Sequence, residues 1–224
     1  ASGTRRSRKR KEYAVGTELV LWKHAGEGQE SESIVCTIEE QLGRGATATV
    51  YRVSYAGMTG ALKVFEAARS ADDFAHLGAE ASMMLQLNYP TSHPNVLAID
   101  FVRFEEESSQ LFFLLRYVDG GDLAQCIANG RLYANEVDKK VQERVLKVVY
   151  KLGSGLAYVH SKGIVHADVK PENTLMTGAG AEKGGEGKDE AERKGGKPVV
   201  SDFGISFRGT STKVEGDGVN GGGH

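Results

Sequence analysis

The sequence has little cysteine, proline and tryptophan, and it contains no long apolar run. The two cysteines, Cys36 and Cys126, are too few for a disulfide framework, and because both have apolar neighbours we expect them to be reduced and buried. No stretch approaches the roughly 18 consecutive apolar residues of a membrane-spanning helix, and the first residues lack the apolar core of a signal peptide. These absences favour an intracellular protein, cytoplasmic or nuclear, with no membrane partner.

A large net charge is also absent, since the 224 residues carry a formal charge of -2. The overall charge therefore gives no reason to expect a specific nucleic acid as a partner. Positive charge is concentrated at the N-terminus, where six of the first twelve residues are Lys or Arg. Such a run could be a nuclear address or a contact for a polyanion, but we favour a solvated chain end.

Residues 1–33 are polar and without a periodic pattern, and they predict a disordered basic leader. After them, five short segments rich in β-branched and aromatic residues predict five strands: TIEEQL, TVYRVSY, ALKVF, VLAIDFVRF and LFFLLRYV. One helix is predicted between the third and fourth strands, behind a capping-box pattern at Ser70 and Asp73. The apolar residues at helical spacing there are Phe74, Leu77, Ala81, Met84 and Leu85.

A long helix dominates the next part of the sequence. Apolar residues from Val141 to Val159 recur at helical spacing before a C-cap signal at Gly163, which predicts a mostly buried helix. Residues 177–197 contain seven glycines and ten charges that cancel, so they cannot bury enough apolar surface to fold, and they predict a disordered insertion. Residues 211–224 are rich in glycine and without pattern, and we expect the sequence to stop inside a loop.

The segment LGRGATATVYR, residues 42–52, places two glycines between two predicted strands. Glycines at such a turn let backbone N–H groups approach phosphate oxygens without a Cβ in the way. An ordinary hairpin turn is the alternative interpretation. The segment is not a Walker A loop, because no Gly-Lys-Ser/Thr follows, and it is not a Rossmann turn, because a strand comes next instead of a helix.

Lys63 and Glu80 are charged residues in otherwise apolar stretches. Lys63 lies in the predicted strand ALKVF, where it either reaches solvent from a sheet edge or is held inward by an anionic partner. Glu80 lies in the middle of the predicted helix and is the candidate partner, although a solvated position fits its spacing equally well. Together with the glycine turn, the two residues suggest a triphosphate contacted by Lys63, which Glu80 braces.

Two further segments, HADVKPEN and PVVSDFG, supply the remaining candidates. In the first, Asp168 can accept or orient a hydroxyl proton, Lys170 can neutralise charge on a phosphoryl group, and Asn173 can offer an oxygen to a hard cation. In the second, Asp202 follows a hydrophobic strand and suits Mg²⁺, which prefers one or two protein carboxylates plus phosphate oxygens.

In this order, the motifs resemble the signature set of the eukaryotic protein kinases. The matching residues are Gly43, Gly45, Val50, Ala61, Lys63, Glu80, Asp168, Asn173 and Asp202-Phe203-Gly204. The resemblance implies an α+β fold with two lobes, a complete β-rich small lobe at 34–117 and an incomplete, mostly helical large lobe at 118–210. It also implies that residues 211–224 are an activation segment that is truncated.

The resemblance assigns a role to each candidate residue. The catalytic residues would be Lys63, Glu80, Asp168 and Lys170. The metal would be held by Asn173 and Asp202. Leu115 would be the gatekeeper, the backbone of residues 116–118 would contact adenine, and Asp122 would lie near the ribose. The residues around ATP would be Leu42, Gly43, Arg44, Gly45, Ala46, Thr47, Ala48, Val50, Ala61, Lys63, Leu115, Arg116, Val118 and Asp122.

The resemblance further implies ATP and Mg²⁺ as cofactors and a protein Ser or Thr hydroxyl as the acceptor, because Lys170 in DVKPEN is typical of the Ser/Thr type. A pseudokinase or nucleotide-binding scaffold is the first alternative, and a degraded catalytic set would have favoured it. A small-molecule kinase on a related fold is the second, although that class does not usually carry both DVKPEN and Asp-Phe-Gly. The oligomeric state is not predicted.

Departures from the family pattern add further expectations. Ala48 replaces the third glycine of the turn, and Ala167 stands where the family has an arginine that reads a phosphate on the activation segment. The sequence therefore does not predict control by phosphorylation of that segment. Because the resemblance ends near residue 210, we expect the long helix to be partly uncovered, and the chain to transfer weakly or not at all and to self-associate.

Overall fold

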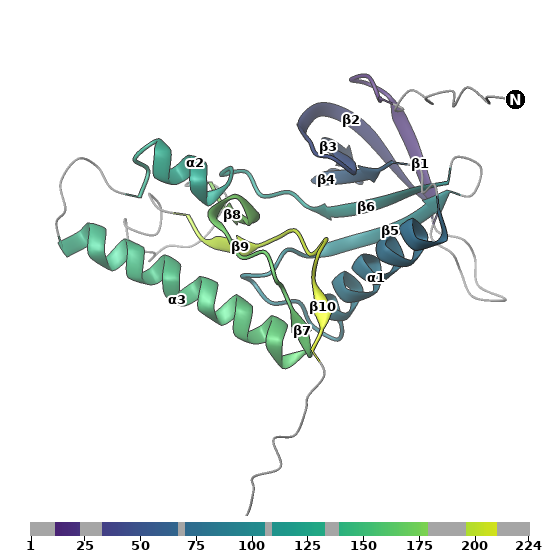
Figure 1. Ribbon diagram of the computed structural model, residues 1–224. Coiled ribbons are helices and arrows are strands. Elements are labelled where there is room, and N and C mark those ends of the chain that lie inside the picture. Colours follow the sequence, from purple (N-terminus) through teal and green to yellow (C-terminus); the bar gives the residue numbers. More distant parts are fainter. Residues whose placement is uncertain are drawn as a thin grey trace, which may run out of the picture.

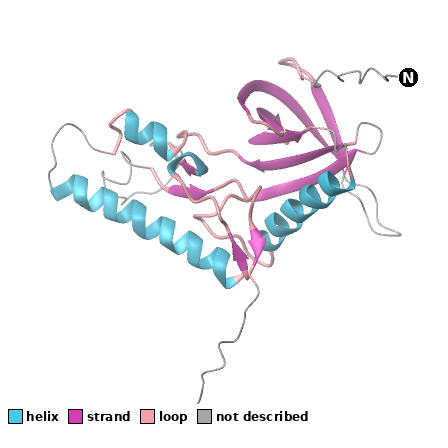
Figure 2. Cartoon of the chain, in the orientation of Figure 1, coloured by secondary structure: helices cyan, strands magenta, loops and turns pink. Residues whose placement is uncertain are grey.

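The computed structural model describes residues 12–22, 33–66, 70–105, 109–132, 139–178 and 196–209 (Figures 1 and 2). Figure 1 shows the sheet and the helix at residues 71–88 at one end of the molecule, and the helices at residues 123–128 and 139–161 at the other, with short strands between them. The predicted α+β fold with two lobes is confirmed. We call the described residues up to 116 the small lobe and those from 117 onward the large lobe.

The small lobe is built on one antiparallel sheet of six strands in the order β1-β2-β3-β4-β6-β5. The strands are β1 (Glu18–Trp22), β2 (Ser33–Arg44), β3 (Ala48–Tyr55), β4 (Met58–Phe65), β5 (Ile99–Glu105) and β6 (Gln110–Arg116). Side chains alternate between the two faces of a strand, and here both faces are packed. On β4, Leu62 and Val64 belong to one hydrophobic cluster, whereas Phe65 belongs to another.

Strand β1 corrects the predicted leader, because part of residues 1–33 is ordered. The segment ELVLW pairs with the start of β2, with Leu21 opposite Ile34 and Val20 opposite Val35, and Leu21 is buried. Since this strand is only five residues long and polar sequence surrounds it, its apolar content did not stand out. Residues 1–11 and 23–32, the rest of the predicted leader, lie outside the described residues.

Helix α1 (Ala71–Asn88) begins with the predicted capping box. The Ser70 hydroxyl accepts from the Asp73 backbone N–H at 3.1 Å, and the Asp73 carboxylate accepts from the Ser70 N–H at 3.1 Å. The predicted apolar face is wrong at two positions, since Phe74 and Leu85 are exposed. The buried stripe is centred on Glu80, Met84 and Leu87, which turns Leu85 outward.

The large lobe contains α2 (Leu123–Ala128), α3 (Lys139–Ser161), the 3-10 turn η1 (Pro171–Asn173) and four short strands. Strand β8 (Thr174–Met176) pairs with β9 (Pro198–Val200), and β7 (Ile164–Val165) pairs with β10 (Phe207–Arg208). Helix α3 lies against β9 and β7 (Figure 1).

Only part of the apolar face of α3 is buried, so the prediction of a mostly buried helix is wrong in part. Among the described residues, Val141, Val148 and Val159 are buried, whereas Val145, Leu146, Val149 and Tyr150 are exposed. Val148 packs in the small cluster with Leu123 and Cys126 of α2, and Val159 belongs to the cluster that contains Val199 and Val200 of β9. The exposure agrees with the expectation of a partly uncovered helix.

The predicted insertion begins and ends as a paired hairpin. Thr177 N–H donates to the Lys197 carbonyl at 3.0 Å, and Lys197 N–H donates to the Thr177 hydroxyl at 2.8 Å, which extends the β8–β9 pair by one step. Residues 177 and 197 are therefore ordered and not part of a disordered segment. Residues 179–195, and the predicted activation segment 211–224, lie outside the described residues.

Both cysteines are free and buried, as predicted. Burial raises the pKa of the Cys36 thiol to about 11, so this residue stays protonated at neutral pH. Within the described part of the chain, no helix combines the length and the apolar character needed to cross a membrane.

Candidate active site

A cavity of about 570 Å³ lies between the two lobes. Its walls come from the turn between β2 and β3, from β3, β4 and β6, from the connection between β6 and α2, and from η1 and β8. This volume falls within the roughly 300–1,000 Å³ of typical small-molecule sites. All the residues predicted to surround ATP line the cavity except Arg44.

Arg44 does not line this cavity. Its guanidinium Nη1 instead donates to the Glu12 carboxylate at 2.6 Å, and both side chains are solvent-exposed. Glu12 belongs to the N-terminal segment that the sequence analysis had placed in a leader. The partner of Arg44 could therefore not be anticipated.

The glycine turn closes one side of the cavity. Gly45 N–H donates to the Ala48 carbonyl at 2.8 Å, and the Thr47 carbonyl accepts from Glu66 N–H at 2.8 Å. A Cβ added at Gly43 would meet no atom within 4 Å, and one at Gly45 would make an ordinary contact of 3.5 Å with the Ala48 carbonyl oxygen. Packing within the protein therefore does not require these glycines, and without a Cβ the backbone of the turn is accessible from the cavity.

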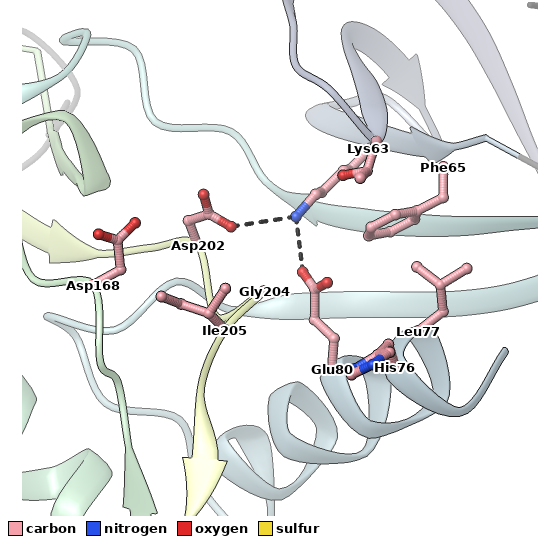
Figure 3. A pocket seen from close by; sticks show the side chains of 10 residues that line it. Lys63, Phe65, His76, Leu77, Glu80, Asp168, Asp202, Gly204 and Ile205 are labelled. Atoms are coloured by element: carbon pink, nitrogen blue, oxygen red, sulfur yellow. Dashed lines mark hydrogen bonds and ion pairs between the residues drawn. The ribbon is translucent and has the colours of Figure 1, made fainter. Parts of the chain in front are cut away.

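Three charged residues that line this cavity, Lys63, Glu80 and Asp202, come from separate parts of the chain and lie close together (Figure 3). Lys63 Nζ on β4 lies 2.8 Å from Glu80 Oε1 on α1 and 3.6 Å from Asp202 Oδ1. Glu80 is only 6% exposed, and a buried carboxylate is costly unless it is paired, so Lys63 stabilises it in this position. Of the two possibilities left open for Lys63, the inward one is observed.

Asp168, Lys170 and Asn173 form a second group beside the first. Lys170 Nζ donates to Asp168 Oδ2 at 2.7 Å, and Asn173 Nδ2 donates to the same oxygen at 2.7 Å and to the Asp168 carbonyl at 3.0 Å. The hydrogen bond from Lys170, supported by Asn173, lowers the pKa of Asp168 below its ordinary value. The carboxylate of Asp168 is therefore ionised at neutral pH.

His166 and Ser201 connect the two segments that carry these groups. His166 Nδ1 accepts from Asp168 N–H at 3.2 Å, which leaves Nε2 to donate to the Ser201 carbonyl at 2.9 Å. Ser201 donates from both its backbone N–H and its hydroxyl to the Asn173 carbonyl, each at 3.0 Å. These hydrogen bonds join the segments that carry Asp168, Asn173 and Asp202 into one unit, which we call the Asp168 unit. Its two connecting residues, His166 and Ser201, were not predicted to have a role.

The backbone is strained where this unit carries its acidic groups. Ala167, just before Asp168, has φ 66°, and Asp202 has φ 63°, a region that non-glycine residues rarely adopt. Strain of this kind persists only where surrounding contacts enforce it, and it is frequent at functional sites.

The connection between β6 and α2, which we call the hinge (residues 116–122), is fixed from both sides. Arg116 N–H donates to the Ala98 carbonyl at 3.0 Å, and Met176 N–H on β8 donates to the Gly121 carbonyl at 2.8 Å. The Asp122 carboxylate accepts from Gln125 N–H at 2.7 Å and thereby caps α2. Asp122 also lines the cavity, and one of its carboxylate oxygens already has this structural contact.

A second, smaller cavity of about 280 Å³ adjoins the charged end and shares Thr47, Lys63, Glu80 and Asp202 with the first (Figure 3). It is also lined by Phe65, His76 and Ile205, which were not among the residues predicted for the site. In the larger cavity the additional lining residues include Met84, Leu97, Phe113 and Leu175. Alternation along the strands could have suggested Phe65, which lies two residues after Lys63 and hence on the same face.

Comparison with known proteins agrees with this geometry. The family model described as protein kinase domain matches residues 36–216. A serine/threonine-protein kinase of Drosophila yakuba is 30% identical over 142 residues, which are 62% of this chain and 17% of that protein. CBL-interacting serine/threonine-protein kinase 19 of Arabidopsis thaliana is 30% identical over 182 residues, which are 80% of this chain and 31% of that protein.

The chain belongs to the protein kinase family. The relatives that it matches are named serine/threonine-protein kinases, and a protein kinase domain is the class of protein that the fold and the comparisons define. The chain spans less than a third of the length of these relatives.

Proposed function

We propose that this chain binds ATP together with Mg²⁺ between its two lobes and directs the γ-phosphoryl group to a Ser or Thr hydroxyl of a protein. The observation that carries the proposal is the arrangement of five residues around two adjoining cavities. The cavity large enough for a nucleotide is lined by Lys63, Glu80, Asn173 and Asp202. Asp168 lines the smaller cavity beside it, together with Lys63, Glu80 and Asp202, and accepts a hydrogen bond from Asn173. These residues are spread over 140 positions of the sequence, and packing brings them together.

The opposite end of the cavity suits a flat, apolar base. Ala61 and Leu115 are cross-strand partners, and with Leu175 they give it apolar walls. The backbone of hinge residues 116–118 lies at its rim and offers peptide groups for hydrogen bonds. A base bound there would direct its phosphates towards Lys63 and the glycine turn.

Lys63 and the glycine turn have complementary tasks in this proposal. Lys63 brings a positive charge that is already oriented by Glu80, so little reorganisation is needed when a phosphate oxygen arrives. The N–H groups of the turn approach the phosphates from the other side, because Gly43 and Gly45 place no side chain between them and the ligand.

The metal-binding residues fit Mg²⁺. Asp202 offers a carboxylate, and Asn173, whose amide N–H groups both go to Asp168, offers its side-chain oxygen. Among the described residues, no group of three or more His, Cys, Asp or Glu side chains could hold a metal alone. A site of two oxygen ligands suits Mg²⁺, which fills its remaining positions with water and phosphate oxygens. When bound, Mg²⁺ would neutralise negative charge on the phosphates.

Asp168 is the group we assign to the acceptor hydroxyl. Its ionised carboxylate can accept a hydrogen bond from that hydroxyl, orient it and take its proton while the new O–P bond forms and the bond from the γ-phosphorus to the bridging oxygen breaks, which releases ADP. Lys170, 2.7 Å from Asp168, brings a positive charge to the place where the transferred group must pass. This pairing and the named relatives support Ser/Thr specificity, and we also propose an intracellular location.

A single-turnover assay with radiolabelled ATP and Mg²⁺ tests the proposal. This chain and the longest product of its gene are each mixed with Ser/Thr peptides and, separately, with small-molecule hydroxyl acceptors, and nucleotide binding is measured in parallel. Transfer to peptides is the expected result for the longest product. Nucleotide binding without any transfer would support a scaffold instead, and transfer only to small molecules would support a small-molecule kinase.

A further inference from the structure

Phe65 touches the ammonium group of Lys63. Lys63 Nζ lies over the Phe65 ring, 4.8 Å from its centroid, and the two residues are two positions apart on the same face of β4 (Figure 3). A cation within about 6 Å of an aromatic face is attracted by the negative charge of that face. The ring is therefore a third group on Lys63, in addition to the carboxylates of Glu80 and Asp202.

The ring itself is held rigidly. Phe65 is only 2% exposed and packs edge-to-face on Phe113 of β6, with ring centroids 4.8 Å apart and an interplanar angle of 69°. Phe113 lies directly opposite Lys63 in the sheet register. The ring that contacts the ammonium group is thus fixed by the same pair of strands that carries Lys63.

The three groups that contact Lys63 belong to different parts of the structure. Glu80 belongs to α1, and Asp202 belongs to the segment after β9, so both can shift relative to the sheet when those elements move. Phe65 cannot, because it is part of the strand that carries Lys63. The ring therefore keeps the ammonium group at the end of the cavity whichever position the two carboxylates take.

We propose that Phe65 is a positioning residue that holds the Lys63 ammonium group at the phosphate end of the cavity. The consequence for nucleotide affinity rests on the proposed function, whereas the effect on the order of Lys63 does not. Phe65 acts only through Lys63 and touches no reacting atom.

The test compares Phe65→Leu with Phe112→Leu in the 224-residue chain. Both phenylalanines are buried in the same sheet, but Phe112 lies in the other cluster, away from Lys63, so it controls for lost packing. A Phe65→Tyr variant keeps the aromatic face, and the smaller cavity beside the ring offers room for the added hydroxyl group. Thermal unfolding of all three variants establishes that each one is folded.

The first measurement is ¹⁵N relaxation of the Lys63 ammonium group without nucleotide. We expect the order parameter of Nζ to fall in Phe65→Leu and to stay at its wild-type value in Phe65→Tyr and Phe112→Leu. Equal order parameters in Phe65→Leu and Phe112→Leu would overturn the proposal. Because no ATP is present, this outcome does not depend on the proposed function.

The second measurement is affinity for ATP with Mg²⁺. A lost cation–aromatic contact corresponds to a loss of roughly threefold to tenfold in Phe65→Leu, with the Tyr variant within about twofold of wild type. If wild type binds no nucleotide, the proposed function fails while the relaxation result still decides the role of Phe65. If wild type binds and Phe65→Leu binds equally well, Phe65 does not position Lys63 for the nucleotide.

Discussion

The two lobes differ in how they hold the functional groups on either side of the cavity. In the small lobe both faces of the sheet are packed, and Lys63 sits between fully buried neighbours, with Leu62 and Phe113 each 0% exposed. In the large lobe the proposed catalytic groups lie on short segments connected by hydrogen bonds, and helix α3 leaves Leu146 and Tyr150 66% and 77% exposed. Side-chain packing positions one half of the site, and a hydrogen-bonded unit positions the other.

This difference has a physical consequence. A packed sheet resists small displacements because every shift costs contacts on two faces. A hydrogen-bonded unit tolerates changes in the surrounding apolar packing as long as its donors and acceptors remain paired. We therefore expect substitutions in the small lobe to act mainly on stability and nucleotide affinity, and substitutions in the Asp168 unit to act mainly on the chemical step.

The largest expected effect is on the chemical step. Asp168→Asn removes the carboxylate to which we assign the acceptor hydroxyl, while the walls of the larger cavity stay unchanged, so we expect a loss of roughly 10²- to 10⁴-fold in the rate of transfer. ATP affinity should change little. Rapid-quench kinetics on the longest gene product, with nucleotide binding measured alongside, check both statements. Wild-type turnover in the variant would remove Asp168 from the reaction.

A matched pair of leucines compares the packing of the two lobes directly. Leu62 is completely buried in the sheet, so Leu62→Ala should lower the free energy of unfolding by about 2–5 kcal/mol. Leu146 is exposed on α3, and Leu146→Ala should change the same quantity by no more than about 0.5 kcal/mol. Urea unfolding monitored by circular dichroism measures both. Equal losses would mean that α3 is covered in solution.

Removing the capping box of α1 should have a smaller effect on the stability of the small lobe. Ser70→Ala removes the acceptor for the Asp73 N–H at the start of the helix that carries Glu80, and should cost about 1 kcal/mol in the free energy of unfolding. Ser161→Ala is the control, because that hydroxyl lies at the end of α3 and only donates to the Tyr158 carbonyl. If the two variants lose the same stability, the cap has no special role.

The smallest effect concerns the pKa of Asp168. The hydrogen bond from Lys170 lowers this pKa, so the carboxylate persists to lower pH than an ordinary aspartate would. Lys170→Met removes that bond, and the pKa should therefore rise, with the anion lost at higher pH than in wild type. Carboxyl ¹³C titration by NMR measures the change. Lys162→Met, whose ammonium group bonds the Tyr89 carbonyl instead, should leave the titration of Asp168 unaltered.

Much of the fold and of the site could be predicted from the sequence wherever the residue types and their spacing indicate the same element or the same kind of site. The five predicted strands are rich in β-branched and aromatic residues, and the capped helix has a capping-box pattern. The site residues were recognisable because each is polar or charged and lies beside an apolar strand, in an apolar helix or in a short motif: Lys63, Glu80, Asp168, Asn173 and Asp202. Strand β1 was missed because five residues carry too little pattern on their own. Its existence depends on pairing with β2, which lies more than ten residues away in the sequence.

Other features depend on backbone groups or on the face that a helix presents. The backbone carbonyls of Ser201 and Asn173 accept the hydrogen bonds that connect the Asp168 unit. Because every residue has such a carbonyl, the residue types in the sequence do not indicate these bonds. The outward position of Leu85 follows from how α1 is rotated on the sheet, which places Glu80 in the buried stripe. Alternation along β4 places Phe65 on the same face as Lys63, but the packing of Phe113 against the Phe65 ring depends on the pairing of β4 with β6, which the sequence does not show.

The most direct test of the account is a crystal structure of this chain with a non-hydrolysable ATP analogue and Mg²⁺. We predict that the base lies against the hinge, that a phosphate oxygen bonds Lys63 Nζ, and that the cation lies between Asp202 and Asn173. A nucleotide bound elsewhere on the surface, with the cavity between the lobes still empty at saturating concentration, would contradict the account.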